Sequence, residues 1–544
     1  MDRIGRLPVL VIAGLVLAAA MLIPAAHAAA TGDRQIAAAF AVSALGFLTL
    51  GVIVALATAA APATAPAQGV LGTLIGVYAG LPLLAAVPFA AVMRDTGLFN
   101  AWWEMLSCMT TTGATLYAAD KVHPALHLWR ATVGWLGGLF ILVAAIGMMA
   151  PLRVGGFELM DRSAGADARF GRLEGPAART ELRPGRDYAA HLADPALRMI
   201  RWGQAIVPLY AGATLALWVL LMMTGDQALN ALIRAMGTLS TSGIGLTGDP
   251  VGASGGLAAE ALVVLFLLAA LTRRAWPGGG ELKASVRVGR DPELRMAAGL
   301  ILLVTLALFL RPFIGAFDEA VQPVATPEPA ADTLVGGLAR AAAAAWGSAF
   351  TALSFLTTTG WTSVHWDGAR AWAGLSAPGL MLAGLAIMGG GVATTAGGVK
   401  LLRVFALGLH ARRELDKIVH PASIAGGGPI TRRLRGSGAY LSFVFFMVFA
   451  LSIVATIALV SLRPVAFETA TMLSVAALTN TGQLAEAIPL IPAFEGSAGI
   501  AGSPWAGWAG LSDATKAILA AAMVAGRLEM LAILALLTPG AWRR

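Results

Sequence analysis

Charged side chains are scarce in this chain of 544 residues, because Asp, Glu, Lys and Arg together make up only 12% of it. A soluble globular domain carries about 25% charged residues. Hydrophobic residues make up 58% of the sequence, and apolar runs of roughly 20 residues, the length that crosses a bilayer core, recur from end to end. The composition therefore excludes an ordinary soluble domain and predicts an all-α polytopic membrane protein.

Cysteine is nearly absent as well, since Cys108 is the only one in the chain. A single cysteine forms neither an internal disulfide framework nor a thiolate metal cluster. The apolar segments hold few titratable side chains, with Arg527 and Glu529 the ones that stand out, whereas an intramembrane enzyme needs a cluster of them. No strand–turn–helix unit with a Gly-x-Gly-x-x-Gly turn for a nucleotide is present either. We therefore expect no enzyme activity, no cofactor in this chain and no nucleic acid partner.

One short motif occurs four times in the chain. Each copy has a large apolar residue, three small polar residues and a glycine. A repeat of this kind fixes the architecture of a chain. The polar residues and glycines are Thr110, Thr111, Thr112 and Gly113; Ser240, Thr241, Ser242 and Gly243; Thr357, Thr358, Thr359 and Gly360; and Thr479, Asn480, Thr481 and Gly482.

Each motif lies in a unit that has a long apolar helix, a short apolar segment ending in the motif, and a second long helix. The short segments are expected at 98–109, 227–239, 341–356 and 466–478. We expect two N-terminal transmembrane helices in 1–69, pore units in 70–152, 200–293, 294–435 and 436–544, and a basic cytoplasmic loop in 153–199. The run 7–30 also resembles a secretory signal peptide, so whether it is retained or cleaved stays open.

Basic residues set the expected orientation of the chain. The stretches 153–201, 273–295 and 400–435 are rich in Lys and Arg, whereas 484–512 has none. Basic loops face the cytoplasm by the positive-inside rule, so the four motifs fall on the outer side. The arginine-rich loop is expected to contact anionic lipid or a soluble partner.

The four motif loops are expected at membrane depth, where non-helical backbone survives only inside protein or along a watery cavity. Hydroxyl groups and a glycine suit a loop whose carbonyl oxygens replace the hydration shell of an alkali cation. The short helix before each loop directs its partly negative C-terminal end at the same point. A transition-metal site would need His, Cys or carboxylate ligands, which the motifs lack. The loops therefore predict one cation pathway.

A glycine-rich stretch interrupts the second long helix of the third unit. Each glycine inside a helix costs up to ~1 kcal/mol relative to alanine, so a continuous helix is disfavoured. The stretch forms either an unwound loop beneath the motif loops or a helical packing seam. Its residues of interest are Gly389, Gly390, Gly391, Thr394, Thr395, Gly397 and Gly398, with Lys400 directly after them.

Arg527 lies between two apolar runs of the last helix, where a charge costs at least ~2.5 kcal/mol on insertion scales. We expect its guanidinium to hydrogen-bond carbonyl groups of 389–398 and to oppose cation passage. The alternative is an arginine that reaches the membrane interface. Lys400 and Arg403 either belong to the same gate or are ordinary basic residues of the cytoplasmic side. Glu104 either holds the frame of the first loop or faces the outer vestibule.

These motifs resemble the Trk/Ktr/HKT superfamily of potassium transporters, and most of all its Trk H-type subunits, over about residues 70–540. Besides the four loops, Trp135-Leu136-Gly137-Gly138, the stretch 389–400 and Gly526-Arg527-Leu528-Glu529 carry the match. The resemblance implies four helix–pore-helix–filter-loop–helix repeats around a central pore. The motif residues would form the potassium filter, and the glycine-rich loop with Lys400 and Arg527 would form the gate. The fourth loop departs from the family pattern at Asn480 and Gln483.

The resemblance further implies a cellular role. It implies potassium uptake across the bacterial cytoplasmic (inner) membrane by a multi-pass protein, with the potassium ion as substrate. It also implies a homodimer with one pore in each protomer and a cytoplasmic nucleotide-binding regulatory subunit of the Trk A type. The alternatives are a sodium-tolerant or nonselective cation pathway, a proton- or sodium-coupled symporter, and a non-transporting membrane scaffold or intramembrane enzyme.

Overall fold

The computed structural model describes residues 7–58, 72–149, 195–277, 291–315, 334–374, 379–420, 437–490 and 507–528. Throughout these ranges the chain forms helices joined by loops, and they contain no strand. The described part of the chain has eight helices that are long and apolar enough to cross a membrane: Val9–Ala30, Arg34–Thr58, Gly72–Val92, Pro124–Met149, Leu197–Met223, Gly252–Ala270, Pro292–Leu310 and Ala439–Ser461. The predicted all-α polytopic class is confirmed.

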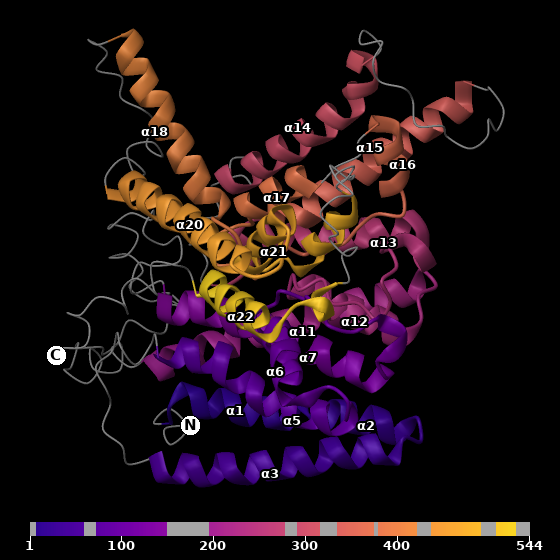
Figure 1. The fold of residues 1–544 in the computed structure, drawn as a ribbon, viewed down its shortest axis with the longest axis vertical. Coiled ribbons are helices and arrows are strands. Elements are labelled where there is room, and N and C mark those ends of the chain that lie inside the picture. Colours follow the sequence, from indigo (N-terminus) through magenta and orange to yellow (C-terminus); the bar gives the residue numbers. More distant parts are fainter. Residues whose placement is uncertain are drawn as a thin grey trace, which may run out of the picture.

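The N-terminal helices form the first layer of the fold. Helices α1 (Val9–Ala20) and α2 (Leu22–Ala30) together make one span, and α3 (Arg34–Thr58) returns beside them. Figure 1 shows these three helices in indigo at one edge of the molecule, with α5 (Leu81–Val92) next to them. On α3, Leu56 is 73% exposed, as expected of an apolar face turned to lipid.

Each unit contributes one short helix that ends in a motif loop. These pore helices are α6 (Gly97–Met109), α12 (Ala228–Leu239), α15 (Leu334–Leu356) and α21 (Phe467–Thr479). The second long helix of each unit packs on the pore helix of the next: α7 (Pro124–Ala144) on α12, α13 (Gly252–Leu267) on α15, α17 (Gly379–Met388) on α21, and α22 (Asp513–Arg527) on α6. The contact between α22 and α6 closes the four units into a ring.

Two of these second helices begin at well-formed caps. At the start of α7, the ring nitrogen Nδ1 of His123 accepts a hydrogen bond from the backbone N–H of Ala125 at 3.2 Å. At the start of α22, the hydroxyl of Ser512 accepts from the backbone N–H of Thr515 at 3.3 Å. Such caps satisfy amide groups that the helix leaves unpaired, so each helix starts at a defined residue beside the ring.

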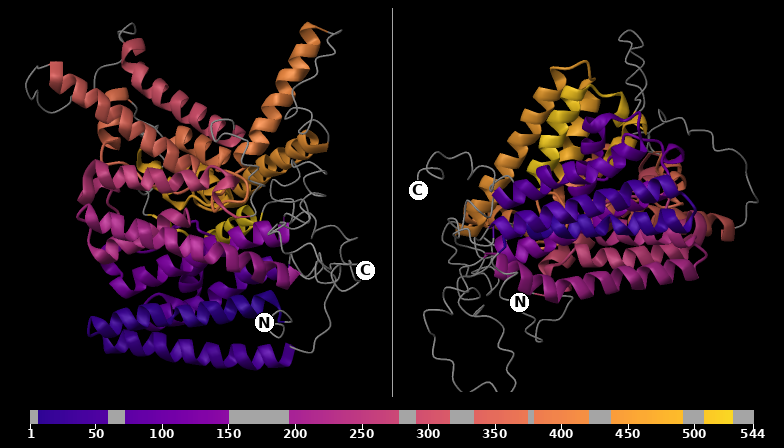
Figure 2. Two further views of the ribbon diagram at one scale, coloured as in Figure 1. Left: turned by 180° about the vertical axis from the view of Figure 1, so that it is seen from behind. Right: turned by 90° about the horizontal axis from the view of Figure 1, so that it is seen from below.

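The first long helices of the second to fourth units lie farther out. They are α11 (Pro195–Met223), α14 (Pro292–Gly315) and α20 (Ser437–Ser461). Figures 1 and 2 show α14 and α20 on the side of the molecule opposite α3, where α18 (Leu401–Val419) projects from the body. Leu303 on α14 is 63% exposed and Leu451 on α20 is 68% exposed, so these helices also present apolar faces to lipid.

The third unit differs in detail from the sequence prediction. Its pore helix begins at Leu334, earlier than the expected residue 341, and the short helix α16 (Trp366–Ala373) was not foreseen. The alanine-rich run 341–345 favours helix strongly, and the helix continues N-terminally from it. The run 375–409 is interrupted as its glycines predict, because α17 ends at Met388 and α18 begins at Leu401.

Most of the basic stretches lie outside the described residues. The loop 153–199 is described only from residue 195 onwards, and residues 278–290, 421–436 and 529–544 are not described. Glu529 therefore lies outside the described residues. The expected orientation of the chain stays a prediction, as do the boundaries of the units.

Candidate functional site

The four motif loops, which we call the first (110–113), second (240–243), third (357–360) and fourth (479–482) loop, end their pore helices in the same way. The second polar residue of each loop has a left-handed backbone: φ is 56° at Thr111, 52° at Thr241, 58° at Thr358 and 55° at Asn480. The N–H of the following residue donates to the carbonyl oxygen five positions earlier, at 2.9 Å in every loop. This is a helix-terminating turn, so all four loops leave their helices in one direction.

The left-handed conformation is costly where the residue is threonine. A β-branched residue with positive φ is an outlier, and such strain costs of order 1–3 kcal/mol. Asparagine adopts this conformation more readily, so Asn480, which departs from the threonine pattern, follows the same backbone with less strain. Hydroxyl pairs brace the loops across this residue, at 2.9 Å in the first and second loops, 3.0 Å in the third and 3.2 Å in the fourth.

The glycines show how the loops meet. A side chain on Gly113 would collide with the carbonyl oxygen of Ser242 in the second loop. A side chain on Gly243 would collide with the carbonyl oxygen of Thr359 in the third loop. The backbone N–H of Gly482 donates to the carbonyl oxygen of Thr112, at 2.7 Å, and so joins the fourth loop to the first. The loops therefore follow one another in chain order around a ring, and their polar side chains are buried.

Buried carboxylates hold the segments that leave two of the loops. Glu104 on α6 pairs with Arg130 on α7, with 2.7 Å between Oε1 and Nε. Its other oxygen accepts the backbone N–H of Leu116 at 2.9 Å. Glu104 is fully buried, so it braces the first loop and does not face the outer vestibule.

Glu260 on α13 plays the same part for the third loop, and sequence reasoning missed it. Its carboxylate accepts the backbone N–H of Val364 at 2.7 Å and the hydroxyl of Ser363 at 2.9 Å. It also accepts the indole N–H of Trp346 at 2.6 Å. The available signal was a single acid within the otherwise apolar run 256–272, because such acids are retained only with partners.

The glycine-rich segment 389–400, which we call the crossing segment, lies against the ring. The hydroxyl of Thr395 donates to the carbonyl oxygen of Leu239, the residue before the second loop, at 3.1 Å. The backbone N–H of Gly397 donates to the hydroxyl of Thr358 in the third loop at 2.7 Å. A side chain on Gly397 would collide with the carbonyl oxygen of Thr479 in the fourth loop. The segment is not helical, so the alternative of a helical packing seam is wrong. Its glycines nevertheless permit close approach to the loops.

A third buried acid fixes the far side of the crossing segment. Glu293, at the start of α14, accepts the backbone N–H of Val392 at 2.9 Å. Its other oxygen accepts the backbone N–H of Arg273 at 3.2 Å. Glu293 is fully buried, and no sequence pattern connects it with residue 392, because the two lie in different elements.

Arg527 reaches the crossing segment from α22. Its Nη1 donates to the carbonyl oxygen of Thr395 at 2.7 Å. The side chain is only 4% exposed, so the alternative of an arginine at the membrane interface is wrong. The contact agrees with the expected bond between Arg527 and a carbonyl group of 389–398.

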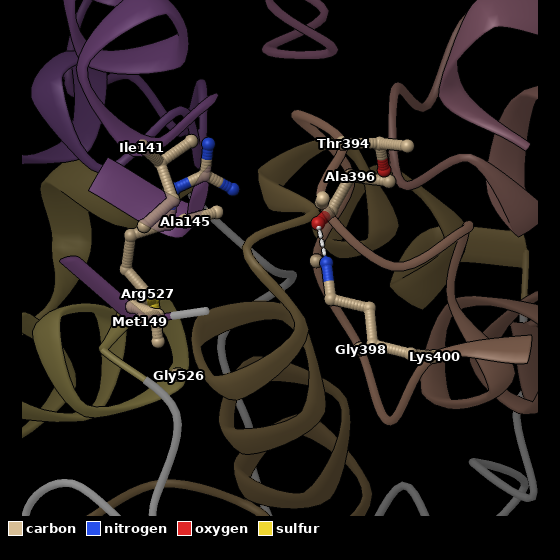
Figure 3. Close-up of a pocket in the computed structure, with 11 residues that line it drawn as sticks. Ile141, Ala145, Met149, Thr394, Ala396, Gly398, Lys400, Gly526 and Arg527 are labelled. Carbon is tan, nitrogen blue, oxygen red and sulfur yellow. Dashed lines mark hydrogen bonds between the residues drawn. The ribbon is translucent and has the colours of Figure 1, made fainter. Parts of the chain in front are cut away.

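Lys400 approaches from the opposite side, as Figure 3 shows, and its ammonium group donates to the carbonyl oxygen of Ala396. Lys400 and Arg527 line a cavity of about 20 Å³ together with apolar residues such as Ile141 and Met149. A cavity of this size holds about one water molecule. Arg403 is fully buried, with its guanidinium 3.7 Å from the ring centroid of Phe445. Lys400 and Arg403 are both buried, and whether they belong to the gate or are ordinary basic residues of the cytoplasmic side stays a prediction.

Comparison with known proteins adds to this geometry. No protein-family model matches the chain. The Trk system potassium uptake protein TrkH of Vibrio parahaemolyticus is 25% identical over 490 residues, which cover 87% of this chain and 84% of that protein. The Trk system potassium uptake protein TrkI of Halomonas elongata is 28% identical over 488 residues, which cover 86% and 82% of the two chains.

The resemblance to the Trk potassium uptake proteins is confirmed. A solved structure agrees with it: the crystal structure of the potassium transporter TrkH from Vibrio parahaemolyticus covers 100% of both chains with a TM-score of 0.72 at 20% identity. At this identity the likeness establishes a Trk-like fold. The roles of the individual loop and crossing-segment residues in this Trk-like chain rest on their own geometry.

Proposed function

We propose that this chain carries potassium ions through the ring of four loops, and that the crossing segment with Lys400 and Arg527 closes the path beneath them. The observation that carries the proposal is the shared backbone turn of the four loops and their contacts in chain order. The similar proteins are named potassium uptake proteins. Those names support a transporter over an enzyme or a scaffold, and potassium as its substrate. That the chain works without a cofactor is part of the proposal.

The physical basis is ligand exchange around the ion. Potassium sheds water where carbonyl and hydroxyl oxygens of the loops replace it. The C-terminal ends of four pore helices add a partly negative potential at the same place. Below the ring, two buried cationic side chains and the crossing segment oppose the ion until the segment moves.

The cellular setting is part of the same proposal. The exposed apolar faces of α3, α14 and α20 place the chain among membrane lipids, and we propose the bacterial cytoplasmic (inner) membrane. A homodimer and a cytoplasmic nucleotide-binding subunit of the Trk A type follow from the resemblance to Trk proteins. A regulatory partner of this kind would act on the crossing segment.

Potassium, rubidium and sodium fluxes in proteoliposomes test the proposal. Replacing the loop glycines Gly113, Gly243, Gly360 and Gly482 one at a time by serine should lower potassium flux or change ion preference about tenfold or more. The new side chain must displace an adjacent loop or, at Gly360, the side chain of Gln483. Gly46→Ser on α3 is the control, since no atom lies within 4 Å of a Cβ there. Unchanged flux and preference in all four variants would show that the loops are not the filter.

The wild-type fluxes decide among the alternatives. Equal sodium and potassium fluxes would support a nonselective pathway. Potassium flux that requires a proton or sodium gradient would support a coupled symporter.

A further inference from the structure

The corner between the third and fourth loops differs from the two corners before it in the ring. At Gly113 and Gly243, the nearest atom to an added Cβ is the backbone carbonyl oxygen of the next loop. At Gly360, the three nearest atoms all belong to the side chain of Gln483, directly after the fourth loop. At this corner the side chain of Gln483 therefore takes the position that a backbone carbonyl oxygen of the next loop has at Gly113 and Gly243.

Gln483 also reaches across the ring. Its Nε2 donates to the carbonyl oxygen of Ser242 at 3.1 Å and to that of Gly243 at 2.9 Å. Because the loops follow one another in chain order, the second loop lies opposite the fourth. The amide thus connects opposite sides of the ring at the level of the glycines.

The remaining atoms of this amide fit the same position. Its Oε1 is buried and has no hydrogen-bond partner among the described residues. The same Nε2 lies 2.7 Å from a Cβ built on Gly113 and 2.5 Å from one built on Gly243. The side chain therefore fills space shared by three loops, and a cation moving along the ring axis meets it.

We propose that Gln483 is a latch across the ring. Its amide N–H groups donate hydrogen bonds to the carbonyl oxygens of Ser242 and Gly243, and an entering alkali cation displaces them. This inference rests on the proposed function, because it assumes that the ring conducts the ion. An amide N–H₂ group carries partial positive charge and offers two donors, so it satisfies the carbonyl pair that would otherwise bind a cation. The latch is uncharged, and the net stabilisation from each of its hydrogen bonds is modest, so an ion can displace it.

The latch makes a specific kinetic prediction. Removing the amide frees the two carbonyl oxygens, so the ion no longer competes with an internal donor. Gln483→Ala should lower the potassium concentration for half-maximal flux by roughly fivefold to 100-fold, the scale set by two neutral hydrogen bonds. Gln483→Met keeps the length of the side chain without the donors, and should shift the same quantity in the same direction by less.

The experiment measures potassium-dependent flux of the full chain in proteoliposomes, with Gln35→Ala as the control because Gln35 is an exposed glutamine on α3. A lower half-saturating concentration in the Ala and Met variants, with the maximal flux kept, supports the latch. An unchanged or higher half-saturating concentration in both variants overturns it, and a higher one would mean that the amide binds the ion. If the wild-type chain carries no potassium, the proposed function itself fails, which is a distinct result.

Discussion

Arg527→Gln removes the guanidinium that bonds the crossing segment to α22. Nη1 of Arg527 donates to the carbonyl oxygen of Thr395 at 2.7 Å, and a hydrogen bond from a charged group contributes about 1.5–3 kcal/mol net. Since each 1.4 kcal/mol is tenfold in an equilibrium constant, the ratio of closed to open segment should fall by about 10-fold to 100-fold. Losing one of two positive charges at the cavity lowers the barrier to a cation further.

Rubidium uptake into proteoliposomes measures this effect. The variant should carry more ion by the same factor until the open state dominates, because a shifted equilibrium saturates once the favoured state is mostly populated. Arg412→Gln is the matched control, since Arg412 is exposed on α18. If Arg527→Gln folds normally and its rubidium uptake equals that of the wild type, the contact with Thr395 does not hold a gate.

Two further predictions concern the buried acids. Glu293→Gln should raise rubidium uptake several-fold, because one of the backbone N–H groups of Val392 and Arg273 loses its carboxylate acceptor. Glu414→Gln is the control, because the Glu414 side chain is half-exposed on α18. Rubidium uptake equal to that of the wild type in Glu293→Gln would argue against an anchoring role. Glu104→Gln should lower the free energy of unfolding by about 3–5 kcal/mol, because it leaves Arg130 buried without its ion-pair partner. Asp367→Asn, at an exposed pair, should cost only ~0–1 kcal/mol, and equal melting temperatures for the two variants would contradict this account.

The pore helices were predictable because four copies of one pattern reinforce one another. The expected segments 98–109, 227–239 and 466–478 differ from α6, α12 and α21 by at most one residue at either end. The interruption at 389–400 was predictable as well, because glycine has a known cost inside a helix. The bond from Arg527 followed from the cost of an unpaired charge at membrane depth.

The partners of the buried acids were not predictable, because hydropathy patterns report which face of a helix is apolar and not which distant residues meet. Glu260 contacts Val364, and Glu293 contacts Val392, across separate elements. The left-handed backbone conformation of the loop threonines was also not predictable, since β-branched residues rarely adopt a positive φ. Gln483 was visible only as a departure from the family pattern, and its reach to the second loop required coordinates.

The most direct measurement of the central claim is the position of the ion itself. Crystals of the protein soaked in rubidium or thallium salts give anomalous difference density at bound ions. Density is expected on the axis of the ring, near the carbonyl oxygens of Ser242 and Thr359, and none is expected in the cavity beside Arg527. Density at other sites with none in the ring, in crystals where the ion is otherwise bound, would contradict the assignment of the four loops as the filter.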